Sequence, residues 1–253
     1  MKTLAYFGTY TNSGSQGIYR AEVDMKNGVI GGLQTAARIP NPSFLSVDTS
    51  GFLLSCVETN NFQNATGGGI ISFRIMEDGS IVQICAENTR GTYPCHICIG
   101  EKSRAVFVSN YGSGSLCVFK MDGEGKLFYV KNFSHKSQTL CGKQYDPHVH
   151  CSILTEDEQK AYVCDLGINR IMVYNMSMGV EYIELEDEFE FPAGSGPRHA
   201  VLSEDKNLLY VVCELSNELI VASSVNGEIL QRHSLLPENT SGFSAAASIY
   251  LCR

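Results

Sequence analysis

Three side chains of this sequence combine the charges needed for acid–base chemistry on an anionic compound. His148, Arg198 and Glu214 supply an imidazole that titrates near neutral pH, a permanent cation and a carboxylate. Gathered in one concave site, such groups can hold an anion, accept a proton from water and stabilise an oxyanion. Any one of them alone is more often a structural residue, so the case for a site depends on the fold bringing them together.

The three residues belong to two columns of polar positions that recur along the chain. The first column follows a proline in each case and comprises Ser43/Phe44, Cys95/His96, His148/Val149 followed by His150, and Arg198/His199. The second column ends an apolar run, at intervals of 52, 55 and 49 residues, and comprises Glu58, Asn110, Asp165 and Glu214. We predict that His148, Arg198 and Glu214 are catalytic. We predict substrate-binding roles for four others, His96, His199, Asp165 and Asn110.

The columns mark an internal repeat of about 50 residues. Four segments open at Pro42, Pro94, Pro147 and Pro197, at intervals of 52, 53 and 50 residues. In each, a short alternating run leads to an apolar run (52–57, 105–109, 161–164 and 208–213), a third run (69–74, 115–120, 170–175 and 218–223) and a weaker fourth. Short runs rich in Val, Ile, Tyr and Phe between Gly, Asn and Asp turns are typical of strands. Four strands per repeat predict an all-β propeller of four-stranded antiparallel blades, whose first strands line a central channel.

We predict that residues 1–253 form one propeller domain, and the two ends of the chain fit this prediction. Residues 4–8 and 17–23 match the second and third strands, so residues 1–40 form half a blade. Residues 245–251 are predicted to begin another first strand. Either they pair with residues 4–8 and close a five-bladed ring, or the chain is an open arc of a larger ring; we favour the arc.

Composition excludes several classes of protein. The 253 residues are 43% hydrophobic and 18% charged, which is enough for a sizeable core. The net charge of −8, without a Lys/Arg cluster, argues against nucleic-acid and anionic-membrane partners. We expect no transmembrane helix and no secretory signal, and most of the ten cysteines lie in apolar runs. Free thiols in a reducing, cytoplasmic location are therefore expected.

Other catalytic motifs explain the sequence less well. Cys95 and Cys98 suggest zinc, but alternation places them on opposite faces of a strand and no second Cys-x-x-Cys completes a ligand set. No Gly-x-Ser-x-Gly elbow is present. The glycines at 67–69 precede a strand rather than a helix, so they are not a phosphate loop. We expect no metal and no cofactor.

Taken together, the motifs resemble the lactonase family of seven-bladed propellers, whose best-known activity is 6-phosphogluconolactonase. The resemblance covers nearly the whole chain and rests on Phe7-Gly8-Thr9-Tyr10-Thr11, Asn41-Pro42-Ser43-Phe44-Leu45, Pro94-Cys95-His96-Ile97, Pro147-His148-Val149-His150, Asp165-Leu166-Gly167-Ile168-Asn169-Arg170-Ile171 and Gly194-Ser195-Gly196-Pro197-Arg198-His199 with Glu214-Leu215. The same fold includes fungal carboxymuconate cyclases, whose channel His, Glu and Arg would match His148, Glu214 and Arg198. Seven blades would need roughly 350 residues, so the resemblance implies about five blades present, a C-terminal truncation and an impaired enzyme.

The expected function is metal-independent hydrolysis of a small anionic sugar lactone. The resemblance implies 6-phosphogluconolactone as the substrate and a place in carbohydrate metabolism, in the pentose phosphate pathway. A cyclase-type lyase using the same residues, or a propeller that only binds a ligand, remain the alternatives. Either His148 or Glu214 is the base, and Arg198 stabilises the oxyanion or holds the phosphate. The oligomeric state is left open.

Overall fold

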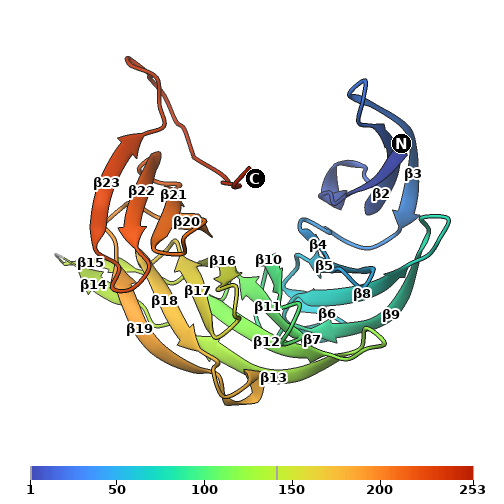
Figure 1. The fold of residues 1–253 in the computed structure, drawn as a ribbon, viewed down its shortest axis with the longest axis horizontal. Helices are drawn as coiled ribbons and strands as arrows, with labels where there is room; N and C mark the ends of the chain where they lie inside the picture. Colours follow the sequence, from blue (N-terminus) through green and yellow to red (C-terminus); the bar gives the residue numbers. More distant parts are fainter. Residues whose placement is uncertain (1, 141, 253) are drawn as a thin grey trace. The chain divides into compact units, whose positions relative to one another are not determined.

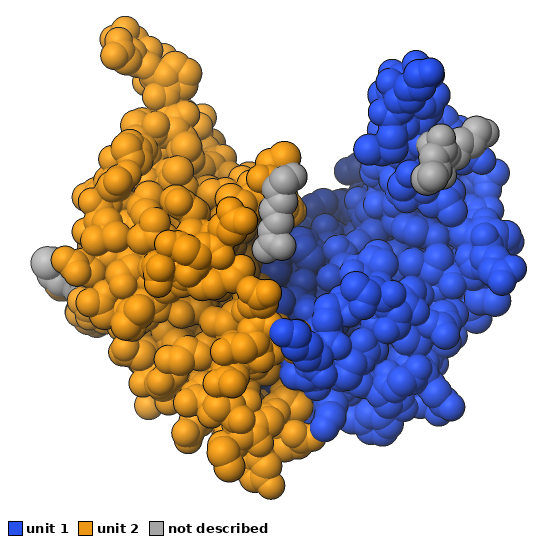
Figure 2. All heavy atoms as spheres, viewed as in Figure 1, with its two compact units in different colours: residues 1–112, 117–130 blue, residues 113–116, 131–253 orange. Residues whose placement is uncertain are grey.

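Short antiparallel strands joined by tight turns make up most of the protein (Figure 1). The computed structural model describes residues 2–140 and 142–252. The chain divides into two compact units, residues 1–112 with 117–130 (unit 1) and residues 113–116 with 131–253 (unit 2; Figure 2). Within the described residues the only helical segments are two 3₁₀ turns, η1 (Thr11–Ser13) and η2 (Val180–Tyr182). The prediction of a strand-rich chain with few helices is confirmed.

Unit 1 contains two complete antiparallel sheets and most of a third. The first sheet has three strands in the order β1 (Lys2–Phe7), β2 (Ile18–Asp24) and β3 (Val29–Ala37). The second has the order β4 (Leu45–Val47), β5 (Phe52–Val57), β8 (Gly69–Ile75) and β9 (Ile81–Asn88), with the hairpin β6 (Asn61–Phe62) and β7 (Ala65–Thr66) inserted. The third has the order β10 (Pro94–Ile99), β11 (Ala105–Asn110), β12 (Ser115–Met121) and β13 (Leu127–Ser134). The strands β12 and β13 contribute residues to both units.

Unit 2 contains two four-stranded antiparallel sheets after a small hairpin. The hairpin pairs β14 (Gln138–Leu140) with β15 (Lys143–Tyr145). The first sheet has the order β16 (Val149–Leu154), β17 (Lys160–Asp165), β18 (Arg170–Asn175) and β19 (Glu184–Glu190). The second has the order β20 (Pro197–Leu202), β21 (Leu208–Cys213), β22 (Glu218–Ser223) and β23 (Ile229–Ser234). Four strands joined in sequence order are the blade pattern expected from the repeat.

Within each unit, successive sheets pack face to face, which explains the apolar second runs. The strands β5 and β11 are buried along their whole length. In unit 1 one core cluster joins the second and third sheets through residues such as Leu54, Cys56 and Val108. In unit 2 a corresponding cluster joins its two sheets through Val173, Leu209 and Val211, among others. A strand covered on both faces requires a continuous apolar sequence, whereas the outermost strands β3 and β23 are largely exposed.

The predicted second and third runs match the observed strands to within one residue at each end. The prediction of a strand over residues 245–251 is wrong, because no described residue after Ser234 belongs to a strand. Just before these residues, the Ser244 carbonyl accepts a hydrogen bond from Asn217 Nδ2 at 2.9 Å. Within the described part of the chain, β2 is the only strand paired with β1. The five-blade closure through residues 245–251 is therefore not formed.

Candidate functional site

A β-bulge interrupts the beginning of three first strands. The pairing register shifts between Pro94 and His96 in β10, between Val149 and Cys151 in β16, and between Pro197 and His199 in β20. The residues inside the bulges are Cys95, His150 and Arg198. A bulge adds one residue to one strand and turns the local side chains away from strict alternation. The bulges therefore decide which way the candidate residues face.

The bulges also correct the predicted alignment of the repeats. The proline motif aligns His148 with Arg198, but in the structure Val149 pairs with Asp165 as Pro197 pairs with Cys213. His150 is thus the counterpart of Arg198, and His148 is the residue just before β16. The equivalence drawn from Pro147 is wrong by two residues. The sequence already indicates this offset. The interval between Asn110 and Asp165 is 55 residues, whereas the interval between Pro94 and Pro147 is 53 residues.

Arg198 and Glu214 form an ion pair at the start of the last sheet. Arg198 Nε donates to Glu214 Oε2 at 2.6 Å, and the two side chains are 23% and 26% exposed. A second guanidinium nitrogen, Nη1, donates to the carbonyl of Ala247 at 2.6 Å. The backbone N–H of Glu214 donates to the carbonyl of Gly196 at 2.8 Å, which fixes the carboxylate beside the Arg198 turn. The structure thus places two of the three residues predicted to be catalytic in contact with each other.

Asp165 is wholly buried, and its carboxylate accepts hydrogen bonds from backbone N–H groups. Its Oδ1 accepts hydrogen bonds from the N–H of His148 at 2.8 Å, of Gly167 at 3.1 Å and of Ile168 at 3.3 Å. Its Oδ2 lies 2.6 Å from His135 Nδ1. A side chain with no exposed surface acts on a site through the groups that it positions. Asp165 therefore holds the backbone at His148, and its predicted contact with substrate stays a prediction.

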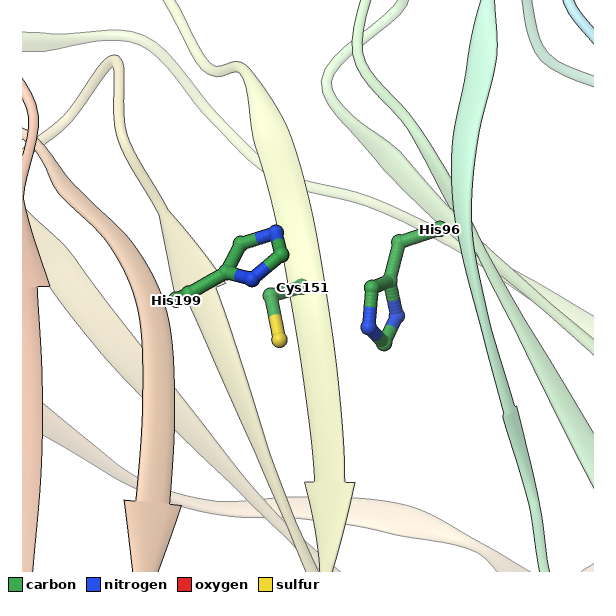
Figure 3. Close-up of side chains that lie close together, drawn as sticks. All are labelled: His96, Cys151 and His199. Atoms are coloured by element: carbon green, nitrogen blue, oxygen red, sulfur yellow. The ribbon is translucent and has the colours of Figure 1, made fainter. Parts of the chain in front are cut away.

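His150 and His199 lie side by side on the neighbouring strands β16 and β20. Their rings meet edge to face with centroids 5.3 Å apart, and both residues are buried, with 8% exposure each. Cys151, next along β16, has its sulfur within 4.8 Å of a ring nitrogen of His199 (Figure 3). Paired imidazoles can donate and accept hydrogen bonds at one spot. The sequence predicts a substrate-binding role for His199, whereas it places His150 in the first column without giving it a role.

The predicted residues of unit 1 have local partners. The ring of His96 on β10 packs against Phe44, with centroids 4.3 Å apart. Asn110 is fully buried and donates to the carbonyl of Thr89 at 3.3 Å, which supports a turn. Glu58 of the same column accepts a hydrogen bond from Tyr10 Oη at 2.8 Å. Partial burial of its hydroxyl, with the adjacent Glu58 adding to the shift, raises the pKa of Tyr10 to about 12.

Two further residues of unit 2 were missed by the sequence analysis. His135 contacts Asp165 through Nδ1 and Tyr174 through Nε2, the latter at 2.9 Å. Burial, followed by the charges of Asp165 and Glu188, raises the pKa of Tyr174 above its ordinary value. No motif draws attention to His135, which follows a strand and falls outside both columns. Only its contact across 30 residues to Asp165 reveals it.

Comparison with known proteins now identifies the family. Residues 4–253 match the family model described as lactonase, 7-bladed β-propeller. The chain belongs to this lactonase family. The 6-phosphogluconolactonase of Bacillus subtilis (strain 168) is 28% identical over 256 residues, covering 99% of this chain and 72% of the relative. The family resemblance inferred from the motifs is confirmed.

Solved structures agree with that assignment. The periplasmic gluconolactonase PpgL of Pseudomonas aeruginosa aligns with a TM-score of 0.89 and 28% identity, over 99% of this chain and 73% of that chain. A protein of Lactobacillus plantarum aligns with a TM-score of 0.84 and 26% identity, over 97% and 71%. The family fold has seven blades, whereas the described residues form one three-stranded and four four-stranded blade-like sheets. Among the described residues, no helix has the length and hydropathy to span a bilayer.

Proposed function

We propose that this lactonase-family protein hydrolyses a sugar lactone, with Arg198 and Glu214 at the centre of its site. The ion pair between them is the observation that carries the proposal. It supplies a fixed cation and a fixed carboxylate side by side, in a partly exposed position at a β-bulge. Ester hydrolysis needs positive charge where the carbonyl oxygen becomes anionic and a base for the attacking water.

The proposed reaction needs one water molecule and no other reactant. The water oxygen bonds to the lactone carbonyl carbon while His148 or Glu214 accepts a proton from it. Arg198 donates hydrogen bonds to the oxygen that carries the negative charge in the tetrahedral intermediate. The bond between the carbonyl carbon and the ring oxygen then breaks, and the proton passes to that oxygen as the ring opens to a hydroxy acid.

We propose 6-phospho-glucono-1,5-lactone as the substrate. The name of the Bacillus subtilis relative supports the phosphorylated lactone, and that of the Pseudomonas aeruginosa neighbour supports a gluconolactone. Arg198 also suits a phosphate, because a guanidinium matches the geometry of two anionic oxygens. His199 would contact the substrate near Arg198, since the two are consecutive on β20. The substrate-binding role of His96, on β10, stays a prediction from the sequence.

A cytoplasmic location is part of the same proposal. All nine cysteines among the described residues are free thiols, and most are buried. Free thiols are the normal state in a reducing compartment. Fractionation of cells followed by immunodetection would test the location, and recovery in a periplasmic or secreted fraction would overturn it.

A substrate panel tests the function. Purified protein is assayed with 6-phosphogluconolactone, unphosphorylated gluconolactone and a carboxymuconate, each with and without a chelator. We expect acid release from the phosphorylated lactone above its spontaneous rate, a slower reaction with gluconolactone and no effect of the chelator. Turnover of the muconate alone would favour the cyclase chemistry. Binding of the lactone without turnover would favour a ligand-binding role.

A further inference from the structure

A buried chain of polar groups runs through unit 2, and the proposed reaction does not use it directly. Asp165 Oδ2 lies 2.6 Å from His135 Nδ1, and His135 Nε2 lies 2.9 Å from Tyr174 Oη. The side chains of Asp165 and His135 are 0% and 2% exposed, and Tyr174 is 1% exposed. Buried polar groups cost free energy unless they are paired. These three satisfy one another.

The direction of the hydrogen bonds follows from the carboxylate. Because Asp165 Oδ2 is an acceptor, His135 Nδ1 carries the proton that is donated to it. In the neutral imidazole Nε2 then accepts from the Tyr174 hydroxyl, which keeps its proton because burial raises the pKa of that residue. Tyr174 is fixed in turn by packing on Phe133, with ring centroids 4.6 Å apart. His135 therefore holds one oxygen of Asp165 in a defined place.

The other oxygen of Asp165 joins the turn at residues 166–169 to the backbone of His148, just before β16. It accepts the N–H groups of His148, Gly167 and Ile168. Leu166 N–H donates back to the carbonyl of His148 at 3.0 Å. If Asp165 rotated about its side-chain bonds, all three amides would lose their acceptor together. The position of His148 thus depends on the orientation of one buried carboxylate.

The turn at residues 166–169 also reaches the segment that carries Arg198. Asn169 has a positive φ of 57°, and its Oδ1 accepts the N–H of Gly196 at 3.1 Å. Gly196 in turn accepts the N–H of Glu214. Residues 165–169 (the 165–169 segment) therefore support the backbone at both His148 and Arg198. This accounts for the Asp165-Leu166-Gly167-Ile168-Asn169 motif, to which the proposed chemistry gives no role of its own.

A cavity gives access to the outer side of this chain of groups. Its volume is about 520 Å³, and its lining includes His135, Ile168 and Tyr174. Removal of the imidazole would enlarge the cavity toward Asp165. A small molecule that fits the imidazole volume can then diffuse into the space. The cavity therefore makes chemical complementation of His135 feasible.

We propose that His135 is a positioning residue of the lactonase site, acting through Asp165 to hold the 165–169 segment and with it the backbone of His148. This inference rests on the proposed function only for its effect on catalysis. Its structural part, the ordering of three amides by His135, can be measured without any substrate.

Hydrogen exchange in His135→Gly tests the structural part. Without the imidazole donor, the amides of His148, Gly167 and Ile168 should exchange at least about tenfold faster, as expected when a charge-assisted hydrogen bond is lost. His135→Asn, whose amide nitrogen replaces Nδ1, should keep exchange within about threefold of the parent protein. Tyr162→Phe is the matched control for Tyr174→Phe, because Tyr162 Oη donates to the Ser224 carbonyl at 2.8 Å elsewhere in unit 2. Of these two tyrosine substitutions, only Tyr174→Phe should speed exchange at the three amides.

Addition of imidazole tests the hydrogen bond itself. At about pH 8 neutral imidazole both donates and accepts, whereas 1-methylimidazole only accepts. Imidazole should restore slow exchange in His135→Gly, and 1-methylimidazole should not. In the active enzyme, kcat on the lactone should fall about tenfold with KM little changed and recover with imidazole alone.

Each result decides one of the two proposals. Unchanged exchange at the three amides in a folded His135→Gly overturns the positioning role, whatever the activity. A second test replaces His135→Gly if that variant does not fold. In that case two results together overturn the positioning role: unchanged exchange at the three amides in Tyr174→Phe, and equal rescue of the folding of His135→Gly by imidazole and 1-methylimidazole. Faster exchange in a protein whose parent form does not hydrolyse the lactone supports the positioning role and overturns the proposed function instead.

Discussion

At the scale of single residues, the chemistry depends on where a bulge places Arg198. A guanidinium in a regular strand would alternate with its neighbours, but the register shift between Pro197 and His199 brings Nε within 2.6 Å of Glu214. The sequence predicted this pair because Arg198 and Glu214 both recur in columns. It could not predict His135 or Tyr174, since their roles arise from contacts across 30 and 39 residues that no local pattern encodes.

The identity of the base is a prediction at this scale. In Glu214→Gln and in His148→Asn the side chain keeps its approximate size and loses the ability to accept a proton from water. We expect kcat/KM to fall about 10²–10⁴-fold in one of the two, the range for loss of general-base catalysis, and less in the other. The pH profiles of kcat/KM for both variants and the parent enzyme identify which residue is the base. Retention of at least about a third of the activity by both variants would exclude the two residues as the base.

At the scale of elements, the sequence predicted strands better than their register. The second and third strands are recognised because an apolar run between two turns leaves little choice of position. The first strands are harder, because β10, β16 and β20 each contain a bulge and because the proline that marks the repeat precedes β16 by two residues. The hairpins β6–β7 and β14–β15 were not predicted, since two- and three-residue strands leave no periodicity to detect.

Gly167 allows a close backbone approach that the candidate site requires. A Cβ at this position would lie 1.9 Å from the carbonyl oxygen of Asp146 and 2.8 Å from the His148 nitrogen. Gly167→Ala should therefore lower the melting temperature and reduce kcat, because backbone next to His148 must move. Gly31→Ala in β3 is the control, since its Cβ would meet no atom within 4 Å. Thermal melts and lactone kinetics check both variants, and equal behaviour of the two would contradict the crowding argument.

The pair Glu218–Arg232 gives the sheet β20–β23 a pH dependence. Hydrogen bonding and charge from Arg232 lower the pKa of Glu218 below its ordinary value of 4.5. A carboxyl group whose pKa is lower in the folded state than in the unfolded state stabilises the fold. This contribution is complete at pH values above the unfolded-state pKa, and it is lost as the pH falls through the folded-state pKa. Arg232→Ala should thus lower the melting temperature at neutral pH and have a smaller effect below about pH 4. A difference that grows on acidification would have the wrong sign.

At the scale of the whole molecule, the repeat period is the strongest information in the sequence. Recurrence at about 50 residues predicts blades without reference to any single motif, and the family match over residues 4–253 agrees. Blade number is less predictable, because each blade contacts mainly its neighbours and the sequence of one carries little information on the total. The substrate is set by a few side chains rather than by the fold, so it stays a proposal.

The central claim is that Arg198 stabilises the transition state of lactone hydrolysis, and one comparison tests it most directly. Initial rates with 6-phosphogluconolactone are measured for the parent enzyme, Arg198→Ala and Arg232→Ala. The last is a matched control, because Arg232 also pairs with a glutamate in the same sheet, at 2.8 Å. We predict a loss of about 10²–10³-fold in kcat/KM for Arg198→Ala, the magnitude for a missing oxyanion donor, and a change within about twofold for the control. Equal rates in the two variants would contradict the assignment.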